Sequence, residues 1–323
     1  MKTKHFALAV LALSLAACNN ENEILNNDGP VAAQFTADIY KAVSTRVNSE
    51  GTGFTDKDCI GINSEDITNV PYVRENGQFG PKGTTIYFND TETKTFSAYY
   101  PYREDSELQN GIVSVNTDQG PEIDFLFASG ATGSTSSPTV SFTGEHAFKH
   151  CMSLVKFNFL EGEGVDFSEK ILKHCMLNGL KTVGTFNTTT GETALTVDYP
   201  SPITMWFDDG ATTSQLFIFP QTLDFTTPLN LSVVYNGVEY TTTLPKPSTS
   251  KLDAGYAYTY NITLNNKGIT VEEPEITPWE PGETNDVSIT YRCPGACVKP
   301  ELPIDIMVRR PPSQAAAAQN ENK

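Results

Sequence analysis

Basic side chains are scarce in this sequence. Its 323 residues include 22 Lys and Arg against 39 Asp and Glu, which gives a formal net charge of −17. Binding to nucleic acid requires clustered cations that neutralise the phosphates. The composition therefore argues against a nucleic-acid partner.

Long apolar runs are also missing beyond the N-terminus. A helix that crosses a bilayer core of about 30 Å needs roughly 20 apolar residues, and no segment after the first fifteen residues approaches that length. We therefore expect everything beyond the N-terminal region to be soluble.

Sequence motifs of catalysis are absent as well. The chain has no Gly-x-Ser-x-Gly, no P-loop and no Gly-x-Gly-x-x-Gly in a strand-to-helix setting. A glycosidase would need two carboxylates across a cleft, and no spacing singles out such a pair. The sequence predicts neither an enzyme nor a cofactor site.

Cysteines are few and do not form an obvious framework. Two copies of Lys-His-Cys-Met, at residues 149–152 and 173–176, offer two His and two Cys for zinc. Neighbouring residues of a strand point to opposite faces, which disfavours a metal site. A Cys151–Cys175 disulfide and buried free thiols remain, and the free thiols are favoured. Cys293 and Cys297 fit a small local disulfide better than a redox pair.

The N-terminus has the features of a lipoprotein signal. Lys2 and Lys4 precede an apolar run, as in secretory signals. Leu15-Ala16-Ala17 then leads into Cys18, the arrangement of a bacterial lipobox. We expect residues 1–17 to be removed and Cys18 to be acylated; the alternative is a plain signal peptide with an incidental cysteine. The polar residues 18–30 predict a flexible tether.

From Val31 onward the chain reads as all-β. Short alternating or apolar runs are broken by Gly, Pro, Asn and Asp about every ten residues, which is typical of β-sandwiches. The best strand candidates are AAQFTADIY, TIYFN, TFSAYYPY, GIVSVNT, LVKFNFL, QLFIFPQ, LNLSVVYNGVEYTTTL and YAYTYNITL.

Two of these runs allow finer predictions. Asn236-Gly237 lies between two alternating segments and supplies the positive-φ residues of a type I′ hairpin. In YAYTYNITL, Tyr256, Tyr258 and Tyr260 fall on one face of a half-buried strand, opposite Ala257 and its neighbours.

A small, polar stretch at residues 129–139, SGATGSTSSPT, suits a loop or a linker. We place a domain boundary there, with an N-terminal β-sandwich domain over 31–135 and a C-terminal one over 136–290. Residues 291–323 then form a C-terminal extension.

Several segments together resemble the fimbrillin-like (Mfa-like) family of Bacteroidia surface lipoproteins, the subunits and accessory proteins of type V pili. They include FTADIYKAVSTR, IDFLFA, VSFTGEHAFKHCMSLVKFNF, LFIFPQT, LDAGYAYTYNITL and ITPWEPG, in family order. The resemblance implies two transthyretin-like β-sandwich domains in tandem and a role in adhesion. It also implies display on the outer membrane through the lipid anchor, incorporation into a fimbrium, and other pilin subunits as partners.

The resemblance further implies maturation by an arginine-specific protease. The matching position is Arg46, so the mature chain would begin at Val47. The polar, Gly-containing residues around it suit an exposed loop that proteases enter. Alternatively, Arg46 is a surface residue of a subunit that keeps its anchor.

Removal of residues 18–46 would take away AAQFTADIY, in which Phe35 and Ala37 alternate with polar residues, and would leave an open sheet edge. Such an edge accepts a strand from another chain. ELPIDIMVRR is a candidate donor, with Ile304, Ile306 and Val308 on one face. The alternative is that residues 301–308 add an edge strand to their own domain.

A rival hypothesis is a non-polymerising surface lipoprotein that binds host or environmental glycans. Exposed aromatic residues such as Trp206 or Trp279 would serve this purpose. For Trp279, between two prolines, the structural interpretation is favoured: its ring closes one end of a sandwich.

Overall fold

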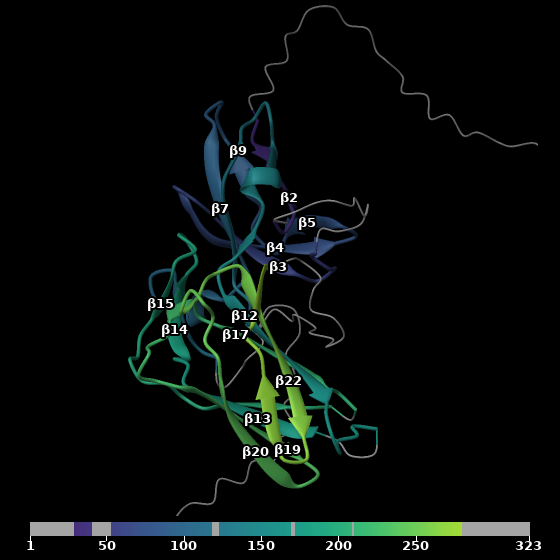
Figure 1. Cartoon of the computed structure of the whole chain (residues 1–323). Helices are drawn as coiled ribbons and strands as arrows, with labels where there is room; N and C mark the ends of the chain where they lie inside the picture. Colours follow the sequence, from purple (N-terminus) through teal and green to yellow (C-terminus); the bar gives the residue numbers. More distant parts are fainter. Residues whose placement is uncertain (1–28, 41–52, 118–122, 169–171, 209, 280–323) are drawn as a thin grey trace, which may run out of the picture.

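The computed structural model describes residues 29–40, 53–117, 123–168, 172–208 and 210–279 (Figure 1). Within these ranges the chain consists of β-strands and two short 3₁₀-helices, η1 (Asp105–Glu107) and η2 (Gly144–His146). No helix in this part of the chain has the length and apolar character to cross a membrane. The all-β prediction is confirmed.

The largest sheet has eight strands and occupies the upper part of Figure 1. In spatial order they are β10 (Thr139–Phe142), β2 (Gln34–Ala37), β5 (Gln78–Pro81), β4 (Ile67–Glu75), β3 (Cys59–Ser64), β7 (Lys94–Tyr100), β9 (Leu126–Gly133) and β11 (Lys149–His150). Strand β10, at one end of this order, also contacts β9 near the other end, so the sheet is rolled. Its concave face encloses an aromatic core that includes Phe35, Tyr72, Phe96 and Phe142.

Two further sheets face each other in the lower part of the molecule and form a β-sandwich (Figure 1). One sheet comprises β17 (Thr213–Ile218), β12 (Ser153–Glu161), β22 (Tyr256–Asn265) and β23 (Gly268–Val271), with β24 (Glu275–Pro278) also paired to β22. The other comprises β16 (Ile203–Trp206), β13 (Leu172–Asn178), β19 (Leu229–Tyr235) and β20 (Val238–Leu244). Alternate residues of both sheets fill one core, as expected for packed sheets.

Small sheets complete the fold. They are β1 (Val31–Ala32) with β6 (Tyr87–Phe88), β18 (Gln221–Thr222) with β21 (Lys251–Leu252), and β8 (Ile112–Asn116) with β14 (Val183–Asn187) and β15 (Thr193–Leu195). The last of these joins residues from both halves of the chain. A third core cluster lies at this junction and includes Tyr99, Phe125, Phe186, Phe217 and Trp279.

The strand predictions are confirmed, since every candidate segment contains a strand of the structure. Asn236 and Gly237 have φ of 50° and 77° and connect β19 to β20, as predicted for the hairpin. The tyrosine prediction holds in part: Tyr258 and Tyr260 are buried in the sandwich core, but Tyr256 is 42% exposed, and Ala257 is buried in the junction cluster.

The predicted boundary at residues 135–136 needs correction. Strand β10 lies beyond that boundary, yet it pairs with β2, and β11 pairs with β9. Both strands therefore belong to the eight-stranded sheet, which extends to His150. The sandwich begins with β12 at Ser153.

Candidate functional site: the seated N-terminal strand

Strand β2 is inserted between two strands that come later in the chain. It runs parallel to β10, where Phe35 lies opposite Val140, and antiparallel to β5, where Phe35 lies opposite Phe79. Backbone bonds continue past the strand: Asp38 N donates to Phe142 O at 3.0 Å, and Phe148 N donates to Asp38 O at 2.9 Å. The segment is thus bonded to β10 and the residues that follow it along 34–40, and to β5 at Phe35, and it fills a position inside the sheet.

Side chains of this segment alternate as the sequence predicts. Ala33, Phe35 and Ala37 are buried, while Gln34 and Thr36 are exposed. The Phe35 ring contacts three rings of the rolled sheet, with centroid distances of 4.6 Å to Tyr72, 5.6 Å to Phe96 and 6.3 Å to Phe142. Without the segment, these rings would line a groove between β10 and β5, and each strand would lose its partner on that side, although β5 would keep β4.

The segment is connected to the rest of the fold through residues 41–52, which the structure does not describe. Both flanks of that connection are held in place. Tyr40 N donates to Phe148 O at 2.7 Å, and the buried Phe54 ring packs 5.2 Å from the Phe148 ring. A cut within 41–52 would therefore leave β1 and β2 held by non-covalent contacts alone, while Phe54 remains packed against Phe148.

Most of the site residues predicted from the sequence lie outside the described residues. These are Cys18, the Arg46–Val47 bond and the tail residues Ile304, Ile306 and Val308, together with Cys293 and Cys297. The sequence did not reveal the partner of the N-terminal strand. The alternation of Val140 and Phe142 in TVSF was the available signal for β10.

The two Lys-His-Cys-Met copies lie in different sheets. His150 ends β11 of the eight-stranded sheet, whereas His174 and Cys175 belong to β13 of the sandwich. Cys151 and Cys175 are both free, so the disulfide alternative is wrong. In the part of the chain that the structure describes, no group of three or more His, Cys, Asp or Glu could hold a metal ion.

Burial raises the pKa of the Cys151 and Cys175 thiols to about 12. For a thiol whose ordinary pKa is 9.0, this shift lowers the thiolate population at pH 8 about a thousandfold, and the thiolate is the reactive form. We expect the fully buried Cys175 to resist alkylation by iodoacetamide at pH 8 and to react readily in urea. Peptide mapping by mass spectrometry measures this. Rapid labelling of native Cys175 would contradict the assignment.

Trp279 is a junction residue. It is 4% exposed, and its ring stacks on His150 at 3.8 Å and on Phe217 at 5.2 Å. Its burial removes it from the candidates for glycan stacking and places it between the rolled sheet and the sandwich, next to the first residue of β22. Trp206, by contrast, is 74% exposed.

The junction also buries an acid–base pair. The Asp124 carboxylate and His150 Nδ1 are 2.7 Å apart, and both side chains are buried. Burial raises the pKa of Asp124, and the neighbouring His150 opposes that shift. Because Trp279 covers the imidazole, the pair is a structural contact that closes the junction.

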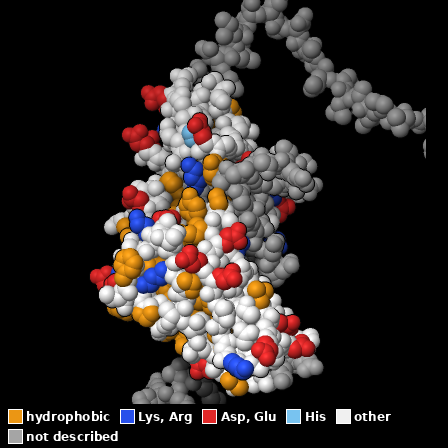
Figure 2. Space-filling view, viewed as in Figure 1, with side chains coloured by type: hydrophobic (Ala, Val, Ile, Leu, Met, Phe, Trp, Pro, Cys, Tyr) orange, Lys and Arg blue, Asp and Glu red, His pale blue; other side chains and the backbone are white. Residues whose placement is uncertain are grey.

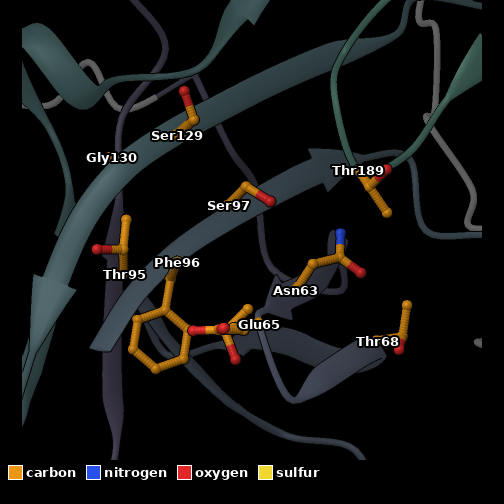
Figure 3. Close-up of a pocket in the computed structure, with 10 residues that line it drawn as sticks. Asn63, Glu65, Thr68, Thr95, Phe96, Ser97, Ser129, Gly130 and Thr189 are labelled. Carbon is orange, nitrogen blue, oxygen red and sulfur yellow. The ribbon is translucent and has the colours of Figure 1, made fainter. Parts of the chain in front are cut away.

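A pocket of 280 Å³ lies beside the junction, lined by β3, β7, β9 and the turn between β14 and β15 (Figure 3). Asn63, Ser97 and Ser129 form one row across its floor. Asn63 Nδ2 donates to Thr188 O at 2.9 Å, and its Oδ1 accepts from Asn69 N at 2.8 Å. The Nδ2 end of this side chain thus holds the turn against the sheet, while its Oδ1 end is fixed by Asn69 of β4, and we interpret the pocket as a structural contact between the turn and the sheet.

Acidic side chains are spread over the face seen in Figure 2, with few basic ones between them. Salt bridges on the described surface are isolated pairs such as Lys94–Asp66 and Lys181–Asp198, which contribute little to stability. The surface charge favours solubility more than a specific anionic ligand.

The structure combines a rolled sheet, in which β2 lies between β10 and β5, with a β-sandwich. This arrangement defines an all-β protein whose N-terminal strand is held by strands from later in the chain. The chain belongs to the fimbrillin-like family, whose profile matches residues 45–279. This is a family of structural and adhesion proteins and not of enzymes, in agreement with the sequence.

Individual relatives agree with this assignment. The chain is 27% identical over 306 residues to "Putative fimbrium subunit Fim1C" of Bacteroides uniformis, covering 87% of this chain and 97% of that protein. A crystal structure of a putative cell adhesion protein from Bacteroides uniformis has a TM-score of 0.62 at 22% identity, covering 78% of this chain and 100% of that one. Another from Bacteroides ovatus has a TM-score of 0.62 at 25% identity, covering 78% and 98%.

Proposed function

We propose that this protein is a subunit of a surface fimbria that acts in cell adhesion and joins its neighbours by strand exchange. Its family and its similarity to a fimbrium subunit support the general role. The observation that supports this mechanism is the position of β2 between β10 and β5. The predicted cleavage site after Arg46 lies in the segment 41–52, which connects β2 to the rest of the fold.

The proposed sequence of events begins at the membrane. Acylation of Cys18 anchors the exported chain to the outer membrane, and acyl chains contribute about 0.8 kcal/mol per buried methylene. An arginine-specific protease then cuts between Arg46 and Val47. Because β1 and β2 precede the cut, they leave with the anchor, and the fimbrium takes up the processed subunit.

The vacated groove defines what can replace β2. It accepts an apolar side chain at every second position, where Ala33, Phe35 and Ala37 are now buried, because strand side chains alternate with a period of two. Ile304, Ile306 and Val308 have the same spacing. A tail from a neighbouring subunit would satisfy the backbone groups of β10 and β5 and cover the exposed rings.

Cleavage of purified residues 19–323 by an arginine-specific protease is expected to yield a new N-terminus at Val47 and to start polymerisation. Electron microscopy and size-exclusion chromatography detect the polymers. A variant lacking residues 301–323 should be cleaved but remain monomeric, because it has no donor strand, and its unfolding temperature before cleavage should match that of the full chain.

Matched variants separate the donor role from a general effect of the tail. Replacing Ile304, Ile306 and Val308 together with Asn should block polymerisation, whereas Asp305→Asn on the opposite face should not. Polymers formed by the truncated chain would place the donor elsewhere, and a large loss of monomer stability on truncation would assign the tail to its own domain. Arg46→Ala should keep the chain monomeric. If cells carry only uncleaved forms of the unmodified protein, the protein is a subunit that keeps its lipid anchor.

A further inference from the structure

The outer face of the four-stranded sheet has an unusual composition. Here, the outer face means the alternate residues of β16, β13, β19 and β20 that point away from the sandwich core. Its first row across the sheet is Trp206, His174, Val234 and Glu239, which lie opposite one another in register. The intervening positions, such as Cys175 and Val233, are buried in the core.

The next two rows carry small polar groups. One includes Thr204, Ser232 and Thr241 around Met176, and the other pairs Asn178 with Asn230 and Thr243. The three rows contain one carboxylate, that of Glu239, and no Lys or Arg. The outer face of the opposing sheet differs, since it carries Lys156 and Glu275 on either side of Thr259.

Residues of the second and third rows, with Glu239 of the first, line a hollow of 420 Å³ on the sheet surface, which Asn178, Asn230 and Glu239 border. The protein holds both amides by their oxygens. Thr243 Oγ1 donates to Asn230 Oδ1 at 3.0 Å, and Gly179 N donates to Asn178 Oδ1 at 3.2 Å. Each NH₂ group is left to donate to a ligand.

Trp206 adds a large apolar surface at the edge of this hollowed sheet. Its ring lies 4.8 Å from the His174 ring at a tilt of 47°, so the imidazole supports the indole from one side. The other side remains open, because the side chain is 74% exposed. An indole held in this way offers a flat platform for the C–H face of a ligand ring.

We propose that the outer face of the four-stranded sheet binds a neutral oligosaccharide. A sugar ring stacks on Trp206, and hydroxyl groups further along the ligand bind the amides and hydroxyls of the hollow. Strands are about 4.8 Å apart and residues rise about 3.3 Å along each strand, so Trp206 and Asn230 are about 16 Å apart. The site therefore fits a chain of several sugars better than a single one.

The same chemistry disfavours other ligands. A phosphorylated, sulfated or sialylated ligand would need cations, and the lining of the hollow holds none. The nearest lysine in sequence is the exposed Lys173, beside His174 at the bulge of β13, while Glu239 and the net charge of −17 repel anions. A protein partner would prefer an apolar centre, but only Trp206, Met176 and Val234 are apolar in this face.

This inference is independent of strand exchange. The sheet lies at the opposite end of the molecule from β2 (Figure 1), so the uncleaved monomer already carries the site. It would supply the adhesive contact that polymerisation alone does not provide.

The test uses uncleaved residues 19–323 on an array of neutral oligosaccharides ending in glucose, galactose, mannose or N-acetylhexosamine, with sialylated and sulfated counterparts. We expect binding to neutral members. For the strongest of them, Trp206→Ala should raise the Kd by about tenfold or more in calorimetry, equivalent to about 1.4 kcal/mol, with the unfolding temperature unchanged. Asn230→Ala should also weaken binding.

Phe225→Ala is the matched control, because Phe225 is 85% exposed but lies on the loop between β18 and β19, outside the outer face. It should bind as the unmodified chain does. The proposal is overturned if no neutral glycan binds, if only acidic glycans bind, or if Trp206→Ala and Phe225→Ala have equal effects.

Discussion

Replacing Phe35 with alanine is expected to lower the free energy of unfolding of the uncleaved chain by about 3–5 kcal/mol, the usual cost of removing a buried phenylalanine ring. Phe35 is 2% exposed and contacts the rings of Tyr72, Phe96 and Phe142. The cavity would lie at the centre of the rolled sheet, where the surrounding strands leave little room for collapse. Urea denaturation followed by circular dichroism measures the change.

Thr36→Ala is the matched control for this substitution. Thr36 is the next residue of β2, but it is exposed, and its hydroxyl donates to Ser141 Oγ at 3.1 Å on the surface. Its removal should change stability by less than about 1 kcal/mol. If the two variants lower the free energy of unfolding equally, Phe35 does not hold β2 in its position between β10 and β5.

Phe35→Ala should also affect assembly. Once the chain is cut after Arg46, only non-covalent contacts retain β2, and Phe35 supplies its largest buried side chain. Weakening these contacts should speed the departure of the strand and hence polymerisation of the cleaved protein. A variant that is destabilised but polymerises no faster would show that strand release does not limit the rate.

The sequence predicted the strands well because alternation and turn residues are local signals. Phe35 and Ala37 alternate with polar residues, and Asn236-Gly237 has the backbone preferences of its turn. Strand partners are a different matter. Strand β2 pairs with β10 about 100 residues later, and such pairing depends on contacts that no short window of sequence contains.

The misplaced domain boundary has a specific physical cause. Residues 129–139 are small and polar, as in a linker, but part of this stretch is small because it is tightly packed. A Cβ atom on Gly133 would lie 2.6 Å from Phe88 Cζ and 2.8 Å from Val140 Cγ2. Glycine here permits close approach of β9 to the core, and composition alone does not distinguish that role from flexibility.

The candidate sites were predicted unevenly for related reasons. The sequence identified the N-terminal strand and the two tryptophans, and it favoured a structural role for Trp279, but it did not reveal what that ring packs against. Trp279 packs on His150 and Phe217, which are far away in sequence. The outer face around Trp206 combines four strands in register, so it became visible only with the sheet order.

Gly61→Ala should be among the most damaging small substitutions, with an expected loss of about 3 kcal/mol, at the upper end of the usual cost of overpacking. Gly61 lies opposite Tyr99 in the pairing of β3 with β7. A Cβ atom at this position would be 2.2 Å from Tyr99 Cε1, so the ring of Tyr99 would have to move.

The Tyr99 ring is poorly able to move. It is fully buried in the junction cluster, and its hydroxyl donates to Asn69 Oδ1 at 2.5 Å. The hydroxyl oxygen of Tyr99 also accepts a hydrogen bond from Arg103 N at 3.1 Å. Displacement of the ring would break these bonds and disturb Phe186, 6.2 Å away on β14. The damage should therefore reach the contact between the rolled sheet and the sandwich.

Trp279 gives a probe of this junction, because it is buried there whereas Trp206 is exposed. In urea titrations of Gly61→Ala, we expect the fluorescence change of Trp279 to occur at lower urea than in the unmodified chain. Trp206→Phe removes the second signal from both proteins without changing the junction. Gly80→Ala on β5 is the matched control, since nothing lies within 4 Å of the Cβ position there. If both glycine variants unfold at the same urea concentration, the close packing of Tyr99 over Gly61 does not support the junction.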